Sequence, residues 1–318
     1  MKSREWVAIP ARLEQTVPEH LIGVRADKIV AELAGVSREK ARRLFEQGVN
    51  VDGTAVDPNQ RVAGGVIDFP MPAEELGTVA EEVDFAVRYE DPELLVVDKP
   101  SGISVHPGAG RRTGTLASGL LHRYPDLEGI GQEGRWGIVH RLDQGTSGLL
   151  LVGRTANAYD FLTDELAARR IHRSYLALVH GVPPMPTGTI DAPIGRDPSH
   201  PTRKKVVPEG RSARTHYKLV EKLGTTSLLE IDLETGRTHQ IRIHLSTIGH
   251  PVVGDRTYTR RADPVRMRRI FLHAARLAFT HPLTGAETIV ESPLPDDLAT
   301  TLEEVRRRFS PATGTVEP

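Results

Sequence analysis

The sequence predicts an α+β protein in which a small N-terminal domain precedes a larger second domain. Two short helical patterns and a hairpin pattern follow one another within residues 20–70. The next segment, residues 71–82, is rich in proline and acidic residues and has the composition of a linker. Short strand patterns then alternate with a few helical patterns over residues 83–309. A chain of 318 residues accommodates two such domains.

The small domain is expected to begin after residues 1–19, which show no periodicity and are predicted to form an arm. Apolar residues at helical spacing predict one helix over residues 27–33 and a second helix after Ser37. Residues 49–56 have a hairpin pattern, because an Asp-Gly pair at their centre suits a two-residue turn. Residues 66–69 predict one further strand.

The second helix of this domain has a basic side. Its exposed arginines are expected to include Arg38, Arg42 and Arg43. Two short helices, a basic second helix and an Asp-Gly hairpin resemble the S4 RNA-binding domain over residues 20–70. This resemblance implies that the three arginines bind RNA phosphates. The alternative is a generic accessory domain, since small helix-helix-hairpin units are common.

The second domain alternates predicted strands with predicted helices. Strands are predicted at residues 85–89, 94–97, 174–179, 215–220, 227–233, 270–279 and 286–290. Helices are predicted at residues 113–121, at residues 157–170 with Asn157 as the cap, and after Thr238 with that threonine as the cap. Residues 182–212 are expected to mix short strands with exposed loops, and residues 310–318 to form a frayed tail.

Residues 137–152 place a polar turn between two apolar runs. The runs 138–139 and 149–152 are predicted to be buried strands, and the Gly, Thr and Ser residues between them allow a sharp bend. The turn holds Asp143 close to Arg141. Asp143 is therefore either a catalytic carboxylate at a rigid strand end or a residue that only caps its own turn.

A second polar cluster lies where strand 227–233 meets the helix after Thr238. Arg237 occupies this strand-helix junction, a position from which a side chain can enter a cleft. Ile241 lies on the expected apolar face of the helix.

The composition excludes several kinds of chemistry. The chain has no cysteine, which excludes disulfides, cysteine zinc sites and thiol catalysis, and which fits a reducing cytoplasm. His239 and His244 are spaced so that neither a helix nor a strand directs both side chains at one ion, and no metal site is predicted. The sequence has no G-x-S-x-G elbow, and its candidate segments offer one prominent carboxylate rather than a glycosidase-like pair.

The charges are segregated, although the formal net charge is only −1. Basic residues gather at 203–214 and at 256–269, and the balancing acids lie elsewhere, so local basic surfaces are expected. One Asp beside several arginines suits chemistry at a sugar carbon of a nucleotide, because a guanidinium favours an ionised carboxylate and binds phosphate or stacks on a base. No apolar run approaches transmembrane length and residues 1–12 lack an apolar signal segment, so no membrane association is expected.

Three motifs, in this order, resemble the signature of the RluA/RluD-type pseudouridine synthases. They are Lys-Pro-Ser-Gly at 99–102 with His-Pro at 106–107, His-Arg-Leu-Asp at 140–143 followed by Thr-Ser-Gly at 146–148, and Gly-Arg-Thr-His-Gln-Ile-Arg at 236–242. The resemblance covers residues 20–295, and the order of domains is similar to the RluD branch. It implies a mixed, mainly antiparallel catalytic sheet flanked by helices.

The resemblance also implies the reaction and the residues that perform it. Uridine in RNA becomes pseudouridine when the base is detached from C1′ through N1, turned, and rejoined through C5, without a metal or an organic cofactor. Asp143 would be the catalytic carboxylate, either as nucleophile at C1′ or as the base that removes a ribose proton. Tyr175 and Ile241 would contact the uridine, and Arg237 would pair with Asp143. Arg141 would fill the space that the flipped uridine leaves.

The RluD-like layout favours large-subunit (23S) ribosomal RNA as the substrate. Transfer RNA is the alternative substrate for the same chemistry. A non-catalytic RNA-binding or ribosome-assembly factor is the alternative from another class, although an intact Asp143, Tyr175 and Arg237 argues against it. A cytoplasmic location and no obligate protein partner are expected.

Overall fold

The computed structural model divides the chain into two compact units, Met1–Leu76 and Gly77–Pro318. It describes residues 12–71, 78–107, 113–132, 134–197, 200–259, 261–263 and 266–309. The predicted tail, residues 1–11 of the predicted arm, and residues 72–77 of the predicted linker lie outside the described residues.

The small unit pairs two helices with a four-stranded sheet. Its helices are α1 (Ala26–Leu33) and α2 (Arg38–Leu44), with 3-10 turns η1 (Glu19–Leu21) and η2 (Phe45–Gln47). The sheet has the order β1-β4-β2-β3, with β1 at Arg12–Thr16, β2 at Asn50–Val51, β3 at Thr54–Ala55 and β4 at Val66–Pro70. Ile29, Ile67 and Phe69 are fully buried between the helices and the sheet.

The predicted hairpin in this unit is confirmed, and the predicted arm is wrong from residue 12 onward. Asp52 and Gly53 both have positive φ, 49° and 77°, as a tight hairpin turn requires. Strand β1 pairs antiparallel with β4, and Arg12 forms an ion pair with Asp68 at 2.7 Å. Its sequence alternates little because the strand is mostly exposed, so periodicity did not identify it.

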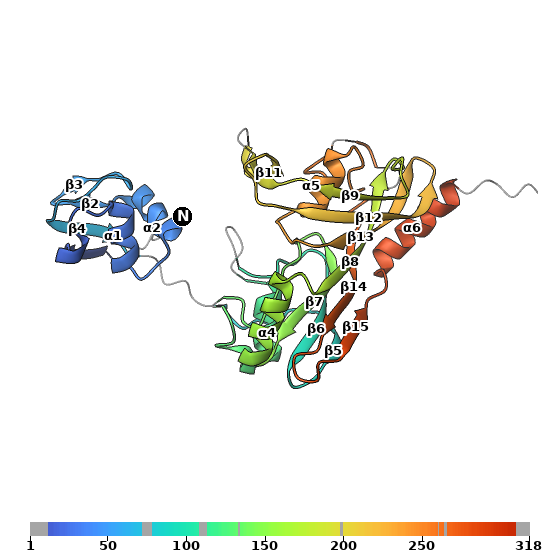
Figure 1. Ribbon diagram of the computed structural model, residues 1–318, viewed down its shortest axis with the longest axis horizontal. Helices are drawn as coiled ribbons and strands as arrows, with labels where there is room; N and C mark the ends of the chain where they lie inside the picture. The colour runs from blue at the N-terminus through green and yellow to red at the C-terminus, as the bar shows by residue number, and fades with distance from the viewer. Residues whose placement is uncertain are drawn as a thin grey trace, which may run out of the picture. The chain divides into compact units, whose positions relative to one another are not determined.

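The large unit is built on one nine-stranded sheet, which Figure 1 shows. Its order is β5-β6-β7-β14-β8-β13-β12-β9, and β15 pairs with β14. The strands are β5 (Ala86–Glu90), β6 (Leu94–Lys99), β7 (Ser147–Gly153), β8 (His172–His180), β9 (Thr187–Asp191), β12 (Arg214–Leu223), β13 (Thr226–Leu233), β14 (Leu272–Thr280) and β15 (Glu287–Glu291). β14 pairs parallel with β7, and the other pairings between the described strands of this sheet are antiparallel. The predicted mixed, mainly antiparallel sheet is therefore confirmed.

Helices cover both faces of this sheet. On one face, α3 (Leu116–Arg123) and α5 (Gln240–Thr247) pack against one core that includes Leu150, Tyr175 and Ile231. On the other face, α4 (Ala156–Ala167) and α6 (Asp296–Phe309) pack against two further cores. A separate ribbon of β10 (Ile194–Asp197) and β11 (His200–Val206) accounts for part of the region predicted to hold short strands and loops.

Two sequence-based expectations about helix caps need correction, and one helix was not predicted. The hydroxyl of Thr155 caps α4 by accepting a hydrogen bond from the backbone N–H of Ala158, so Asn157 is not the cap. Helix α5 begins after His239, which has left-handed backbone conformation and makes no side-chain cap, so Thr238 is not its cap. Helix α6 was not predicted, although three buried apolar residues repeat along it at helical spacing: Leu298, Leu302 and Val305.

The segment before β7 also differs from the expected strand. Ile138 makes only an isolated bridge to Val152, and residues 139–146 form a loop rather than half of a hairpin. The loop is held by a second loop at residues 100–103, because the Gly102 N–H donates to the Gln144 carbonyl at 2.8 Å and the Ser101 hydroxyl donates to the Gly145 carbonyl at 2.9 Å. Two of the recognised motifs therefore position each other.

Gly148 permits the parallel pairing of β7 with β14. Its φ is +114°, and a Cβ at this position would lie 2.3 Å from the carbonyl oxygen of Ala274. Gly145, three residues earlier, has ordinary van der Waals space, since a Cβ there would lie 3.4 Å from the side chain of Ile270.

We therefore expect Gly148→Ala to lower the free energy of unfolding by about 3 kcal/mol or more, because the backbone clash adds to an unfavourable φ. Gly145→Ala, in the loop just before β7, is the matched control and should change this free energy by less than about 1 kcal/mol. Equilibrium denaturation of the full chain measures both values, and equal stability of the two variants would contradict the assignment.

Candidate active site

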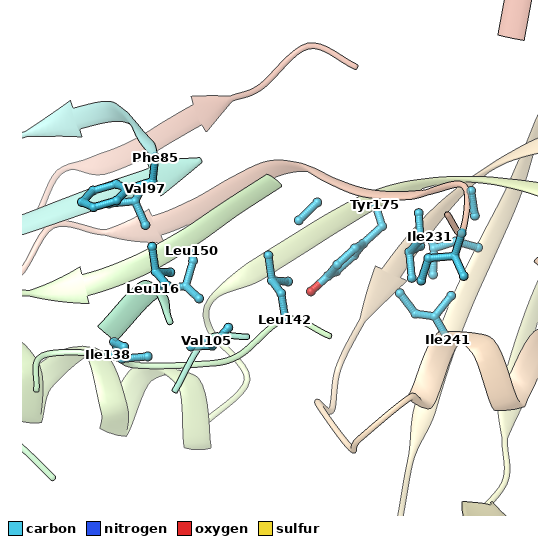
Figure 2. Packing of buried hydrophobic residues seen from close by; sticks show 14 of the residues in the cluster. Phe85, Val97, Val105, Leu116, Ile138, Leu142, Leu150, Tyr175, Ile231 and Ile241 are labelled. Carbon is cyan, nitrogen blue, oxygen red and sulfur yellow. The ribbon is translucent and has the colours of Figure 1, made fainter. Parts of the chain in front are cut away.

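One cavity of the large unit collects the residues that the sequence singled out. It has a volume of about 420 Å³ and is lined by the loop before β7, by β8, and by the junction between β13 and α5. Its lining includes the five site residues expected from the sequence: Arg141, Asp143, Tyr175, Arg237 and Ile241. Figure 2 shows the Tyr175 ring between Leu142 and Ile241, with its hydroxyl directed to the Leu142 side.

Asp143 lies in this cavity and is paired with Arg242. The Nη1 of Arg242 donates to Oδ2 of Asp143 at 3.3 Å, and 16% of the Asp143 side chain is exposed. The predicted pairing of Asp143 with Arg237 is wrong, because the Nε of Arg237 donates instead to the carbonyl of Ser212 at 3.0 Å. Arg237 lies at the strand-helix junction as predicted and faces the same cavity.

A second carboxylate fixes Arg242 from behind. Asp255 is 1% exposed and receives two hydrogen bonds from Arg242, from Nε at 2.8 Å and from Nη2 at 3.0 Å. Asp255 is itself held by the backbone N–H of Thr257 at 2.9 Å. The guanidinium of Arg242 also lies 5.1 Å from the ring centre of Tyr258. This planar, two-point contact leaves the remaining Nη1 of Arg242 directed at Asp143.

The turn that precedes Arg242 is stabilised by hydrogen bonds of the side chains within the turn. Gln240 accepts hydrogen bonds from the Arg237 N–H at 2.9 Å and from the Thr235 hydroxyl at 2.8 Å. His239 has φ +58°, an uncommon conformation for a residue with a side chain, and its Nδ1 lies 2.8 Å from the hydroxyl of Tyr258. Burial lowers the pKa of His239, and the nearby charge of Asp143 opposes that effect.

Tyr175 and Arg141 occupy different depths of the cavity. Tyr175 is 5% exposed, and burial raises the pKa of its hydroxyl while the nearby Arg173 charge opposes this effect. Arg141 is exposed, and its Nη1 lies 3.5 Å from Nε2 of His106 in the upstream loop. The cavity therefore has a charged, accessible rim and a largely apolar wall at Tyr175 and Ile241.

Lys99, from the first motif, is a further buried cation close to Asp143. It is fully buried, and its Nζ donates to the carbonyls of Pro100 at 2.7 Å and Ile103 at 3.0 Å. Burial lowers the pKa of Lys99 to about 7, and the charge of Asp143 opposes this shift. Lys99, His239 and Arg242 lie within the three motifs, but the sequence indicated no individual role for them. The burial of Lys99 and Arg242 is the signal that the sequence lacks.

Two of the three arginines expected to bind RNA, Arg38 and Arg42, surround a buried carboxylate together with Arg25. Asp27 is fully buried and accepts hydrogen bonds from Arg25, Arg38 and Arg42 at 2.9–3.2 Å. The side chains of Arg25, Arg38 and Arg42 remain 37%, 53% and 46% exposed, so one buried negative charge orients three accessible positive ones. Arg43 is 70% exposed and pairs with Glu39 at 3.6 Å.

No described helix is both long and apolar enough to cross a membrane. In the same part of the chain, no group of three or more His, Asp or Glu side chains is placed to hold a metal ion.

Comparisons with known proteins agree with the motifs. A family model described as RNA pseudouridylate synthase matches residues 93–247. A protein named Ribosomal large subunit pseudouridine synthase D, from Nitrosomonas europaea, is 44% identical over 92% of this chain and 88% of its own length. A protein named Uncharacterized RNA pseudouridine synthase, from Chloroflexus aurantiacus, is 48% identical over 92% of this chain and 94% of its own length.

A solved structure agrees in fold. Human RNA Pseudouridylate Synthase Domain Containing 4 superposes with a TM-score of 0.55 at 23% identity, covering 70% of this chain and 93% of the human chain. At that identity the likeness shows the fold alone. Together with the curated relatives, it confirms the resemblance that the three motifs indicated.

Proposed function

Because the chain belongs to the RNA pseudouridylate synthase family, whose members convert uridine in RNA to pseudouridine, we propose that Asp143 is its catalytic carboxylate and large-subunit ribosomal RNA its substrate. The observation that carries the first part is the position of Asp143. Its carboxylate enters a cavity of about 420 Å³, partly exposed and fixed by Arg242. A flipped nucleotide needs such a recess, and a carboxylate at its wall can reach the sugar.

The residues that line the cavity have different roles in the proposed reaction. Tyr175 and Ile241 supply a buried apolar wall on which a uracil ring can pack. Arg242 holds Asp143 at the sugar, either for attack at C1′ or for removal of a ribose proton. Arg141 and Arg237 stand at the more accessible part of the cavity, where they can contact the RNA strand and the space that the flipped base leaves.

The proposed substrate rests on the relatives and on the small unit. The Nitrosomonas europaea relative is named for the large ribosomal subunit, and it matches the chain across both units. We propose that residues 20–70 act as an S4-like RNA-binding domain joined by residues 71–82 to a catalytic domain at 83–309. The three exposed arginines around Asp27 support this part of the proposal. A cytoplasmic location and the lack of an obligate protein partner stay predictions.

The activity can be tested by tritium release from RNA labelled at C5 of uridine, because C5 loses its hydrogen when it joins C1′. Unmodified large-subunit ribosomal RNA, small-subunit ribosomal RNA and transfer RNA would be compared. We expect wild-type protein to release tritium from the large-subunit RNA, and Asp143→Asn to lower the single-turnover rate by at least about 10³-fold. Asp160→Asn, on the exposed side of α4, is the matched control.

Different results would contradict different parts of the proposal. Release from transfer RNA alone would refute the ribosomal substrate and leave the chemistry intact. Release by Asp143→Asn at the wild-type rate would refute the catalytic role of Asp143. No release from any RNA, free or within unmodified large subunits, would favour a non-catalytic RNA-binding protein.

The small unit's role can be tested through the salt dependence of RNA binding. Arg43→Gln leaves the bonds to Asp27 intact, and we expect it to reduce the slope of log K against log salt by about 0.7–0.9. Neutralising Arg38 and Arg42 as well should reduce the slope by about 1.4–1.8 more, since each phosphate contact releases counterions. Thermal unfolding would check that the unit stays folded. An unchanged affinity and slope in the folded triple variant would show that these arginines do not bind RNA.

A further inference from the structure

Arg173 is a buried cation without an acidic partner in the described part of the chain. It lies on β8 two residues before Tyr175, so both side chains are on the cavity face of the strand. Arg173 is 6% exposed. Its Nη2 is 3.5 Å from the carbonyl of Leu233, and its Nε has no hydrogen-bond partner. Most of the donors of this guanidinium are thus unused.

The groups around Arg173 do not neutralise it. Burial and the Arg173 charge together lower the pKa of His140 to about 3, so that imidazole is neutral at physiological pH. The cavity lining has two carboxylates, Asp143 and Glu234. Asp143 is engaged by Arg242, and Glu234 is engaged by Arg169 and His216, both at 2.8 Å. The wall around Arg173 therefore carries a positive charge that no described residue compensates.

A buried charge without a partner is costly, and it is retained most readily where a ligand supplies the opposite charge. The RNA offers two candidates, a backbone phosphate and the base. The phosphates of a flipped nucleotide stay at the cavity mouth, where Arg141 and Arg169 are exposed. The base is the part that reaches the buried wall beside Tyr175. Arg173 is thus placed for the base rather than for the phosphate.

The reaction creates an anion at that place. Whether Asp143 attacks C1′ or removes a ribose proton, the C1′–N1 bond breaks heterolytically and its electron pair leaves with the uracil. The negative charge is spread over N1, O2 and O4 until C5 forms the new bond to C1′. The C5 proton is then lost and N1 gains a proton, so the uracil ends neutral. No oxidant, reductant or further reactant is needed.

We propose that Arg173 is a catalytic residue that donates hydrogen bonds to a carbonyl oxygen of the uracil and stabilises the uracil anion as the C1′–N1 bond breaks. The proposal rests on the proposed function. In this role Arg173 is a preorganised cation, and an opposite charge lies next to it only when the uracil leaves as an anion. Because the anion forms by either route, the role does not depend on how Asp143 acts.

The first test separates anion stabilisation from RNA binding and from folding. With an RNA that the wild type modifies, Arg173→Met should lower the single-turnover rate by about 10²–10³-fold, while RNA affinity and its salt slope stay unchanged. Arg173→Lys keeps a cation and should recover part of the rate. The midpoint of thermal unfolding of Arg173→Met should not fall, because the variant removes a buried unpaired charge.

The second test varies the leaving group. Fluorine at C5 withdraws electrons and stabilises the uracil anion, so cleavage of 5-fluorouridine should need Arg173 less. Loss of 5-fluorouridine, measured after nuclease digestion of the RNA, reports C1′–N1 cleavage. We expect the defect of Arg173→Met to be smaller with 5-fluorouridine than with uridine by about tenfold.

Three outcomes would overturn the role of Arg173 while the wild type remains active. They are a wild-type rate for Arg173→Met, a weaker affinity with a shallower salt slope, which would indicate a phosphate contact, and an equal defect with both bases, which would indicate a structural role. An inactive wild type on every RNA would instead refute the proposed function.

Discussion

The site depends on one buried interaction, the two-point ion pair between Arg242 and Asp255. Removing two charges from water is unfavourable, and a pair of this kind is retained only with good geometry and with its remaining hydrogen bonds satisfied. Both conditions hold, since Asp255 also accepts from the Thr257 N–H and Arg242 stacks near Tyr258. The pair fixes the plane of the guanidinium, and that plane brings Nη1 to Asp143. Losing one partner would leave a buried charge uncompensated, at a cost of about 3–5 kcal/mol.

Around this pair the protein arranges positive charge at two depths. Exposed arginines lie at the cavity mouth, whereas Arg173 is buried beside Tyr175. Asp143 is the carboxylate of the cavity that does not pair with a residue at the rim. It lies between the exposed arginines and the buried Arg173. A neutral nucleoside can enter such a cavity, and the charges that develop during its isomerisation meet groups already in place. The hydrogen bonds between the loops at residues 100–103 and 143–146 help to keep Asp143 in position.

Much of this could be predicted from the sequence, and the failures have physical causes. Apolar runs located central strands such as β7, which is buried along its whole length, and alternation located β13, where Ile231 is buried and Asp232 is exposed. Strand β1 was not predicted, because it is mostly exposed. The three motifs identified the family and the lining residues of the cavity. The motifs could not show whether Arg237 or Arg242 pairs with Asp143, because Asp143 and Arg242 are 99 residues apart in the sequence. The residue that positions Arg242 for this pairing is Asp255, which lies outside every motif. Arg173 gave no signal, since burial of a charge is visible only in three dimensions.

The most direct test of this account is the single-turnover rate of uridine isomerisation by Asp255→Asn, a change in a residue that is buried behind Arg242 and does not line the cavity. Asp297→Asn, which alters a more exposed two-point pair with Arg269 outside the cavity, is the control. If the pair positions Asp143, Asp255→Asn should be slower by about 10²-fold at saturating RNA with its affinity for RNA retained, because small misplacements of reacting groups are costly. A folded Asp255→Asn protein with the wild-type rate would contradict the account.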